Sequence, residues 1–358
     1  MLIHLIDLSF LFFFSLATTF TMRKVAKKVS LVDKPNSRKL HNGVIPLVGG
    51  ISICISILYF LFNNPNILPN TVLYSTCIII LVVVGALDDK FDLSFKLRFA
   101  IQAALSVAMM ILGGIELNTI GDIFGTGEIV TLGWFGYLVT ILAVVGAINA
   151  FNMVDGIDGL LGGLSIVTFG GLGLMLSHDG QYNLAYICLV LVVVIIPYIL
   201  LNLGLFGRRR KVFMGDAGSM LIGFTVIWLL LLSSQNGTNP PLRPVTALWL
   251  IAVPLLDMTA IMVRRMRRGD SPFKPDREHL HHIFQRLGFS STQTLVAISC
   301  IATAFAFIGI YAEIRGVPEF VMLYSFIICF FIYLLVLSNI WKITTWAKNK
   351  LGKSNHNN

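Results

Sequence analysis

Eleven long apolar runs divide this chain and limit its possible folds more than any other feature. A helix needs about 20 predominantly apolar residues to cross the hydrocarbon core of a bilayer. The runs are continuously apolar, whereas the strands of a membrane β-barrel alternate between apolar and polar residues. We therefore predict an all-α polytopic membrane protein with about eleven transmembrane helices. The runs cover residues 3–21, 46–62, 71–87, 97–113, 131–149, 160–177, 184–203, 217–232, 244–263, 294–312 and 319–340.

Composition supports a membrane-embedded chain and excludes several other classes. Apolar residues make up 56% of the 358 residues and charged residues only 13%, whereas an ordinary globular chain carries about 25% charged residues. A soluble domain with so few charges could not cover its surface, and disordered, collagen-like or disulfide-rich chains have other compositions. We therefore expect one integral membrane domain over residues 1–340, followed by a basic cytoplasmic tail over residues 341–358.

The placement of the basic residues predicts the orientation of the chain. Of the 27 Lys and Arg residues, 25 lie in the connections that follow odd-numbered runs or in the C-terminal tail, with Arg98 at a run's edge counted among them. Only Arg243 and Arg315 lie on the other side. The positive-inside rule then places the N-terminus outside and the C-terminus in the cytoplasm. Topology thus accounts for part of the net charge of +9, and we expect no nucleic-acid partner.

An acidic cluster, DDKFD, occupies residues 88–92 at the cytoplasmic end of the third run. On a helix, Asp88 and Asp92 would share one face with Asp89 beside them. Three carboxylates this close repel one another unless a cation or basic groups compensate. The cluster is therefore either a site for Mg²⁺ or a diphosphate, or a solvated helix end balanced by nearby Lys and Arg residues. Spacing alone leaves both interpretations open.

A polar stripe, NAFNMVDGIDG, emerges directly from the fifth run. Its polar residues recur every three positions, at Asn149, Asn152, Asp155 and Asp158. Polar and acidic groups at membrane depth are costly and usually mark a functional site. The interleaved glycines permit close backbone approach or positive φ angles. A helix cap would need one such residue rather than four, so we favour a functional role over capping.

The segment FMGDAGS, residues 213–219, begins the eighth run and follows the basic stretch RRRK. Its Asp216 is flanked by glycines, which makes it a plausible metal ligand, because Mg²⁺ favours one or two carboxylates together with substrate phosphates. A simple N-cap for the following helix is the alternative. The basic stretch itself is more typical of a topology signal than of catalysis.

The loop 264–293 combines arginines with the histidine motif HLHH. Its candidates are Arg265, His279, His281 and His282. Histidine can bind Zn²⁺, but the partner residues of known zinc motifs are missing, so charged imidazolium and guanidinium groups that bind phosphate are favoured. A basic surface that attracts anionic lipids is the alternative. We expect the nearby Asp257 to pair with Arg264, with a catalytic role as the alternative.

The four motifs all fall on the predicted cytoplasmic face, and together they suit one chemistry. Carboxylates, a divalent cation and basic groups at a membrane surface favour phosphoryl transfer from a water-soluble anionic donor to a membrane-embedded acceptor. A transporter would instead place paired halves and charges near the bilayer midplane. A non-catalytic lipid-binding scaffold is a further alternative.

In their order and in their places between eleven runs, these motifs resemble the polyprenyl-phosphate N-acetylhexosamine-1-phosphate transferase family, and most closely its WecA-type subgroup. Residues 32–50 and 257–282 also resemble that subgroup. The related MraY transferases carry a different histidine loop and a different stretch where this chain reads NGVIP at residues 42–46. This difference favours an N-acetylglucosamine donor.

The resemblance implies a glycosyl-1-phosphate transferase of the bacterial inner membrane. Its reaction would convert UDP-N-acetylglucosamine and undecaprenyl phosphate to undecaprenyl-diphospho-N-acetylglucosamine and UMP, the first membrane step of a cell-surface glycan such as O-antigen or common antigen. Another UDP-N-acetylhexosamine remains an alternative donor. The family also implies Mg²⁺ as cofactor, with Mn²⁺ as the alternative, and a homodimer in the membrane lipid.

The resemblance also assigns roles to individual residues. Asp216 and Asn152 would hold the metal. The catalytic group would comprise Asp88, Asp89, Asp155 and Asp158, with Asp88 orienting or deprotonating the lipid phosphate, whose second pKa lies near 6. The donor would be bound by Asn149, Arg265, His279, His281 and His282. Direct attack by the lipid phosphate is favoured over an aspartyl intermediate, because the acceptor is already a competent nucleophile.

Overall fold

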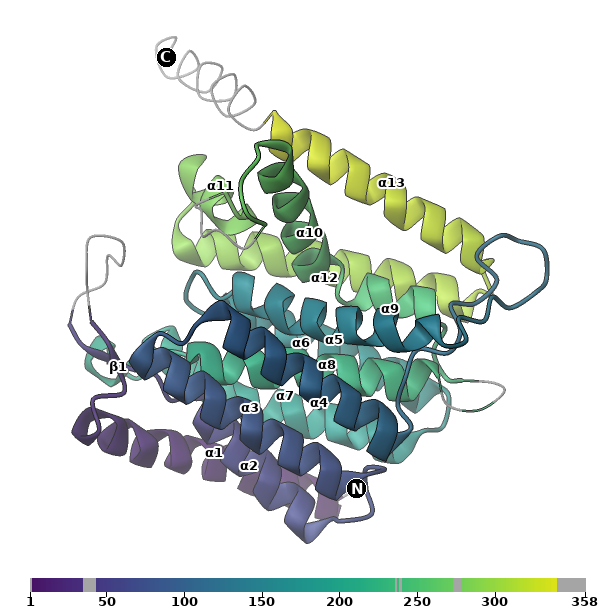
Figure 1. Cartoon of the computed structure of the whole chain (residues 1–358). Helices are drawn as coiled ribbons and strands as arrows, with labels where there is room; N and C mark the ends of the chain where they lie inside the picture. Colours follow the sequence, from purple (N-terminus) through teal and green to yellow (C-terminus); the bar gives the residue numbers. More distant parts are fainter. Residues whose placement is uncertain (1, 35–42, 236, 238–239, 273–277, 340–358) are drawn as a thin grey trace, which may run out of the picture.

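The computed structural model describes residues 2–34, 43–235, 237, 240–272 and 278–339. Within these ranges the chain is almost entirely helical (Figure 1). The predicted tail, residues 341–358, lies outside the described residues. The helices are α1 (Leu2–Lys28), α2 (Gly49–Asn63), α3 (Thr71–Phe91), α4 (Phe95–Gly113), α5 (Phe135–Met153), α6 (Leu160–His178), α7 (Tyr182–Asn202), α8 (Gly215–Ser234), α9 (Pro244–Leu250), α10 (Ala252–Arg267), α11 (Leu280–Arg286), α12 (Ser291–Ile314) and α13 (Glu319–Ser338).

The helices match the predicted architecture of an all-α multi-pass membrane protein. Each of the eleven apolar runs contains helix. In the described part of the chain, nine helices are long and apolar enough to cross a membrane, or ten if α9 and α10 are counted as one span. Helix α2 is apolar but shorter, with 15 residues.

The ninth run, predicted as one span that Pro254 could kink, is broken into two helices. Helices α9 and α10 meet at Ile251 and are bent by 85° relative to each other. Pro254, in the first turn of α10, explains the break. In a continuous helix its ring would clash with the carbonyl of Leu250, whereas the first turn of a new helix tolerates proline.

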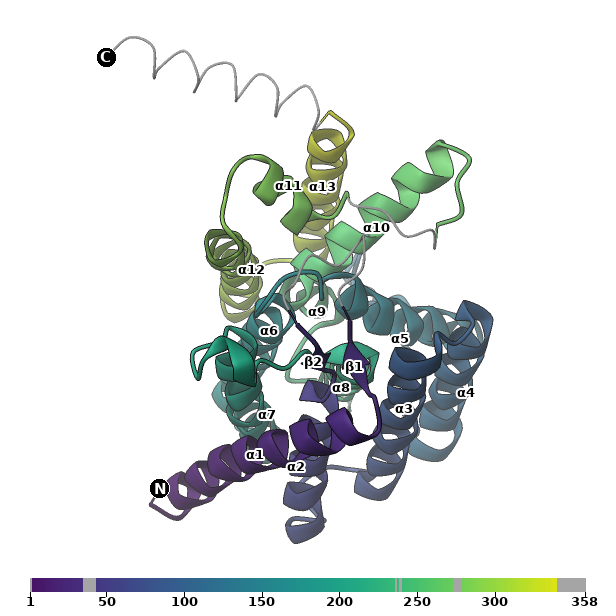
Figure 2. The same cartoon turned by 90° about the vertical axis from the view of Figure 1, so that its left-hand side faces the viewer.

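Helix α8 forms the centre of the bundle. The whole of its span is buried inside the protein, and Figure 2 shows it surrounded by other helices. Glycines on its neighbours let their backbones approach closely, as is common between membrane helices. A Cβ atom at Gly50 of α2 would overlap the backbone of Gly218, and one at Gly85 of α3 would overlap the backbone of Ala217. The start of α8 is therefore clamped between α2 and α3.

This clamp predicts a loss of stability when Gly85 is changed to Ala. The added methyl group would force α3 away from α8, and such overpacking costs about 1–3 kcal/mol. Thermal unfolding of the purified protein in detergent should show a lower midpoint for Gly85→Ala. Gly170→Ala in α6 is a matched control, because a Cβ there meets no atom within 4 Å. Equal midpoints for the two variants would contradict close packing at the start of α8.

A small set of backbone contacts joins the ends of α1, α2 and α8. Strands β1 (Val32–Asp33) and β2 (Ile45–Pro46) form an antiparallel pair. Directly after β2, the amides of Val48 and Gly49 donate to the carbonyl of Phe213, at 3.2 and 2.9 Å. These contacts hold the segment before α8 at the end of the bundle where the predicted motifs lie. The short 3₁₀ helix η1 (Arg208–Arg210) precedes this segment.

Candidate active site

Asp89 joins the end of α3 to the start of α8. Its Oδ1 accepts a hydrogen bond from the amide of Asp216 at 2.9 Å, and its Oδ2 accepts one from the amide of Ala217 at 3.4 Å. Carboxylates are favourable at helix N-termini because they satisfy free amides and interact with the helix dipole. Asp89 therefore fixes the position of Asp216 within the site.

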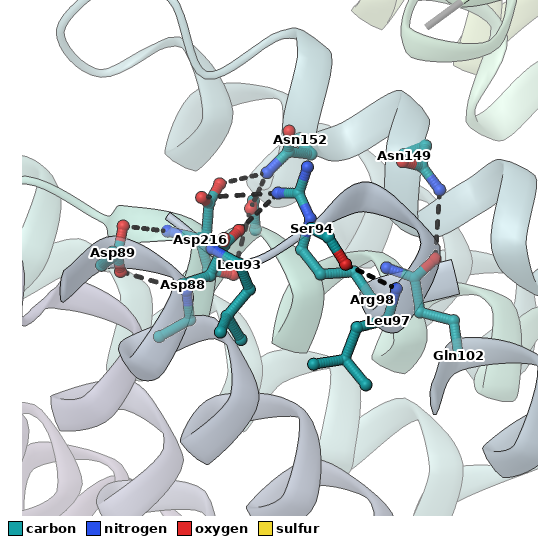
Figure 3. Close-up of polar contacts among 12 residues, drawn as sticks. Asp88, Asp89, Leu93, Ser94, Leu97, Arg98, Gln102, Asn149, Asn152 and Asp216 are labelled. Carbon is teal, nitrogen blue, oxygen red and sulfur yellow. Dashed lines mark hydrogen bonds and ion pairs between the residues drawn. The ribbon is translucent and has the colours of Figure 1, made fainter. Parts of the chain in front are cut away.

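Asp88 and Asp216 lie on either side of a guanidinium group. Asp88 is buried, its Oδ2 forms an ion pair with Arg98 Nη1, and its Oδ1 accepts a hydrogen bond from the amide of Leu93 at 2.8 Å. The same Nη1 lies 3.7 Å from Asp216 Oδ2 (Figure 3). Arg98 therefore reduces the repulsion between the carboxylates of Asp88 and Asp216.

Asn152, at the end of α5, reaches the same cluster. Its Nδ2 donates to Asp216 Oδ1 at 2.5 Å and to Ser219 Oγ at 2.8 Å. Asn149 lies one turn earlier but points elsewhere: its Nδ2 donates to Gln102 Oε1 at 3.1 Å (Figure 3). The same Nδ2 donates to the carbonyl of Val145 at 2.7 Å. The structure therefore places Asn152 beside Asp216 and Asn149 against α4.

The donor set around Asp216 fits a magnesium ion that also binds substrate. Among the described residues, no group of three His, Cys, Asp or Glu side chains is arranged to enclose a metal ion. Mg²⁺ does not require such a cage, because it commonly takes one or two carboxylates and completes its shell with water and substrate phosphates. Asp216 offers carboxylate oxygens. If the side-chain amide of Asn152 is rotated by about 180°, its oxygen lies beside them. These two side chains are the ones that could hold the ion.

Asp155 and Asp158 lie in the turn between α5 and α6. Asp158 pairs with Lys211, whose Nζ lies 2.5 Å from Asp158 Oδ2. Burial raises the pKa of Asp155 to about 7, and the negative charges of Asp216 and Asp158 act in the same direction. Asp155 is therefore sensitive to any cation bound at Asp216, although it makes no direct bond to that residue in the described contacts.

The histidine segment packs directly on this turn. His281 is buried, and a Cβ atom at Gly156 would overlap its Nε2. Gly156 thus allows the ring of His281 to approach the backbone of the turn closely, as the glycines of the polar stripe suggested. Burial lowers the pKa of His281 to about 3, with His282 and His279 acting in the same direction and Asp257 opposing them. We expected charged imidazoles here. His281 is instead neutral, because desolvation outweighs the attraction of Asp257.

The other two histidines lie around His281. The rings of His279 and His281 are stacked, with centroids 5.8 Å apart, and those of His281 and His282 are 4.2 Å apart. Arg265 is buried in the last turn of α10, where its Nη1 donates to the carbonyl of Pro272 at 2.6 Å. This hydrogen bond joins Arg265 to the loop that follows α10.

The expected pair between Asp257 and Arg264 is wrong. Arg264 pairs with Glu278 at 3.1 Å. Asp257 Oδ2 instead lies 2.8 Å from Nδ1 of His279. The expectation assumed two helical turns of separation on one helix, whereas tertiary packing brought a residue 22 positions away into contact.

Sequence reasoning also missed two residues as members of the site. Arg98 was considered only as a countercharge, and Lys211 only as part of a topology signal. Arg98 could have been found because it is the one arginine between the third and fifth runs. Lys211 could have been found because it is the basic residue nearest to the FMGDAGS segment.

Comparison with known proteins is consistent with this geometry. Residues 71–234, which span α3 to α8 and hold the acidic cluster, match the model of glycosyl transferase family 4. Proteins named undecaprenyl-phosphate alpha-N-acetylglucosaminyl 1-phosphate transferase are similar over nearly the whole chain. The one from Escherichia coli K12 is 54% identical, over 96% of this chain and 93% of its own length.

Two further relatives carry the same name. The protein from Yersinia pestis is 54% identical over 96% of this chain and 93% of its own length. The protein from Haemophilus influenzae Rd is 49% identical over 92% of this chain and 93% of its own length. The histidine segment lies beyond residues 71–234, which the family model matches. It falls within the part of the chain that is similar to these relatives, because the similarity covers 96% of the chain. The chain therefore belongs to the family of the undecaprenyl-phosphate alpha-N-acetylglucosaminyl 1-phosphate transferases.

Proposed function

We propose that this protein transfers N-acetylglucosamine-1-phosphate from UDP-N-acetylglucosamine to undecaprenyl phosphate. The products are undecaprenyl-diphospho-N-acetylglucosamine and UMP. The observation that carries the proposal is the convergence of Asp88, Arg98, Asn152 and Asp216 at one end of the buried helix α8. The names of the relatives described above supply the substrates. None of those relatives is a transporter, so that alternative has no support.

The proposed reaction is a direct phosphoryl transfer. A phosphate oxygen of the lipid forms a bond to the phosphorus that carries the sugar, and the bond from that phosphorus to UMP breaks. A lipid monophosphate has a second pKa near 6 and is largely dianionic at neutral pH, so it needs no strong base. Catalysis then depends on positioning and charge neutralisation.

The chain's own residues divide these tasks. Asp216 and Asn152 would hold Mg²⁺, with Mn²⁺ as the alternative, and this ion would neutralise charge on the diphosphate. Arg98 carries a guanidinium group that matches phosphate geometry, and Asp88 holds it in place. We propose that Asp88 and Arg98 orient the lipid phosphate. Asp89 acts through the backbone of α8 by fixing the position of Asp216.

The nucleotide sugar is proposed to lie along the turn 155–159 and the histidine segment 279–282. His281 carries an N–H group without a charge and is buried against Gly156. The resemblance also assigns Asn149 and Arg265 to the donor, although their described contacts are with Gln102 of α4 and the carbonyl of Pro272. Comparing UMP release with UDP-N-acetylglucosamine and UDP-N-acetylgalactosamine tests the donor. Faster release with the second would replace the donor in this proposal by another N-acetylhexosamine.

His281→Ala is expected to reduce kcat/KM for UDP-N-acetylglucosamine by about tenfold or more, because it removes a buried hydrogen-bonding group from the donor region. The KM for undecaprenyl phosphate should change little. Steady-state UMP release with each substrate varied in turn checks both values. His178→Ala, at the exposed end of α6, is the matched control. Unchanged donor kinetics in His281→Ala would remove the histidine segment from the donor site.

We also propose the cellular setting of the reaction. The distribution of basic residues supports about eleven spans, with an outside N-terminus and a cytoplasmic C-terminus. The site then faces the cytoplasm, where nucleotide sugars are made, in the bacterial inner membrane. The family resemblance supports a homodimer. Cysteine labelling from either side of the membrane, at positions in the 203–214 and 114–134 connections, tests the orientation.

A further inference from the structure

Asp257 in α10 is a buried carboxylate that the proposed chemistry does not use. Only 1% of the residue is exposed. Its Oδ1 accepts hydrogen bonds from the hydroxyl of Tyr333 at 2.6 Å and from the amide of Leu280 at 3.0 Å. Its Oδ2 lies 2.8 Å from Nδ1 of His279. Three donors from two other segments thus compensate the burial of one carboxylate.

These contacts fix the histidine segment from outside. An ionised carboxylate accepts hydrogen bonds but cannot donate them, so the proton of the His279 ring must lie on Nδ1. The bond to the Leu280 amide fixes the backbone at the start of α11 as well. Apolar residues of α10, α11 and α13 pack together around this point, among them Ile261, Ile283 and Leu334. Figure 1 shows the three helices next to one another.

The fixed ring lies next to the donor region. His279 stacks on His281 with nearly parallel rings, 4° apart in orientation. His281 in turn fills the space beside Gly156 in the turn that carries Asp155 and Asp158. A continuous series of contacts therefore runs from Tyr333 on α13, through Asp257 and the two histidine rings, to the aspartate turn.

We propose that Asp257 and Tyr333 are positioning residues for nucleotide-sugar binding. They hold the His279 ring in one tautomer and one orientation, and through it they place His281 against the aspartate turn. A helix near the C-terminus of the chain thereby takes part in donor recognition without touching the donor. This inference rests on the proposed role of the histidine segment in binding the donor.

Two substitutions separate this role from general packing. Asp257→Asn keeps the size of the side chain and an oxygen for Tyr333 and Leu280, but it places an NH₂ group opposite the proton of His279. The ring must then move its proton to Nε2 or lose the bond. Tyr333→Phe removes a single hydroxyl group. Tyr324→Phe, an exposed tyrosine on the same helix, is the matched control.

The experiment measures UMP release while each substrate is varied. We expect kcat/KM for UDP-N-acetylglucosamine to fall about tenfold or more in Asp257→Asn and about fivefold in Tyr333→Phe. The KM for undecaprenyl phosphate should stay within about twofold in both, and Tyr324→Phe should match the wild type. Tyr333 acts on the histidine segment through the carboxylate of Asp257. The double variant should therefore be little worse than Asp257→Asn alone.

Several results would overturn the inference. One is donor kinetics in Tyr333→Phe equal to those of Tyr324→Phe. Another is a loss in Asp257→Asn that affects the two substrates equally, and a third is fully additive losses in the double variant. Tyr333→Phe keeps the inference testable if Asp257→Asn does not fold. Failure of the proposed function is distinct, because the wild type itself would then release no UMP, or His281→Ala would leave donor kinetics unchanged.

Discussion

Asp216→Asn is expected to lower the rate of UMP release by about 10³-fold or more, a loss of the size caused by removing a group that stabilises transition-state charge. Asp216 is the point where Asp89, Asn152 and the Arg98 guanidinium converge. The amide of the variant keeps the shape of the side chain but loses the negative charge that a magnesium ion requires. The fold should remain, because the backbone contact to Asp89 is unaffected.

The measurement is a titration of activity with Mg²⁺ at saturating substrates. The variant should need a higher Mg²⁺ concentration for whatever activity remains. Asp179→Asn, at the exposed far end of α6, is the matched control and should behave as the wild type. A wild-type rate and an unchanged Mg²⁺ requirement in Asp216→Asn would refute the metal assignment.

Arg98→Ala is expected to reduce the rate by about 10²-fold or more, because it removes a preorganised cation from the region of the transferred phosphoryl group. It also leaves Asp88 and Asp216 without their countercharge, and removing one partner of a buried pair is destabilising. The Arg98 side chain is 26% exposed, so solvent screening reduces this cost. We therefore expect a lower thermal midpoint together with a raised KM for undecaprenyl phosphate.

A second substitution separates the two effects. Asp88→Asn combined with Arg98→Ala removes both charges of the pair, so the thermal midpoint should recover while activity stays low. Lys96→Ala, an exposed basic residue on the same helix, is the matched control. Recovery of activity together with stability in the double variant would show that Arg98 only balances charge and does not act on the substrate.

The helices were predictable from sequence because their signal is local. A continuous apolar run of this length has few alternatives in a membrane, so each run contains helix. A kink in the ninth run was foreseeable, but the full break between α9 and α10 was not, because an apolar run does not show how sharply the helix bends. Pro254 was visible in the sequence, yet proline in membrane helices is common, and its effect depends on where the preceding helix ends.

The site was predictable as a set of motifs but not as a geometry. Glycines and acidic residues at the ends of apolar runs marked the segments, whereas the partners of these residues depend on packing between distant helices. Asp89 bonds to the amide of a residue 127 positions away, and that contact requires the close approach at Gly85. The neutral state of His281 likewise follows from its burial, which a histidine-rich loop does not reveal.

The most direct test of the account is a single assay on the purified protein in detergent. UDP-N-acetylglucosamine, undecaprenyl phosphate and Mg²⁺ are supplied, and UMP and the lipid product are measured together. The account predicts equal amounts of UMP and undecaprenyl-diphospho-N-acetylglucosamine, formed only when both substrates and the metal are present. No UMP under varied metal and lipid conditions, or UMP released without a lipid-linked sugar, would contradict it.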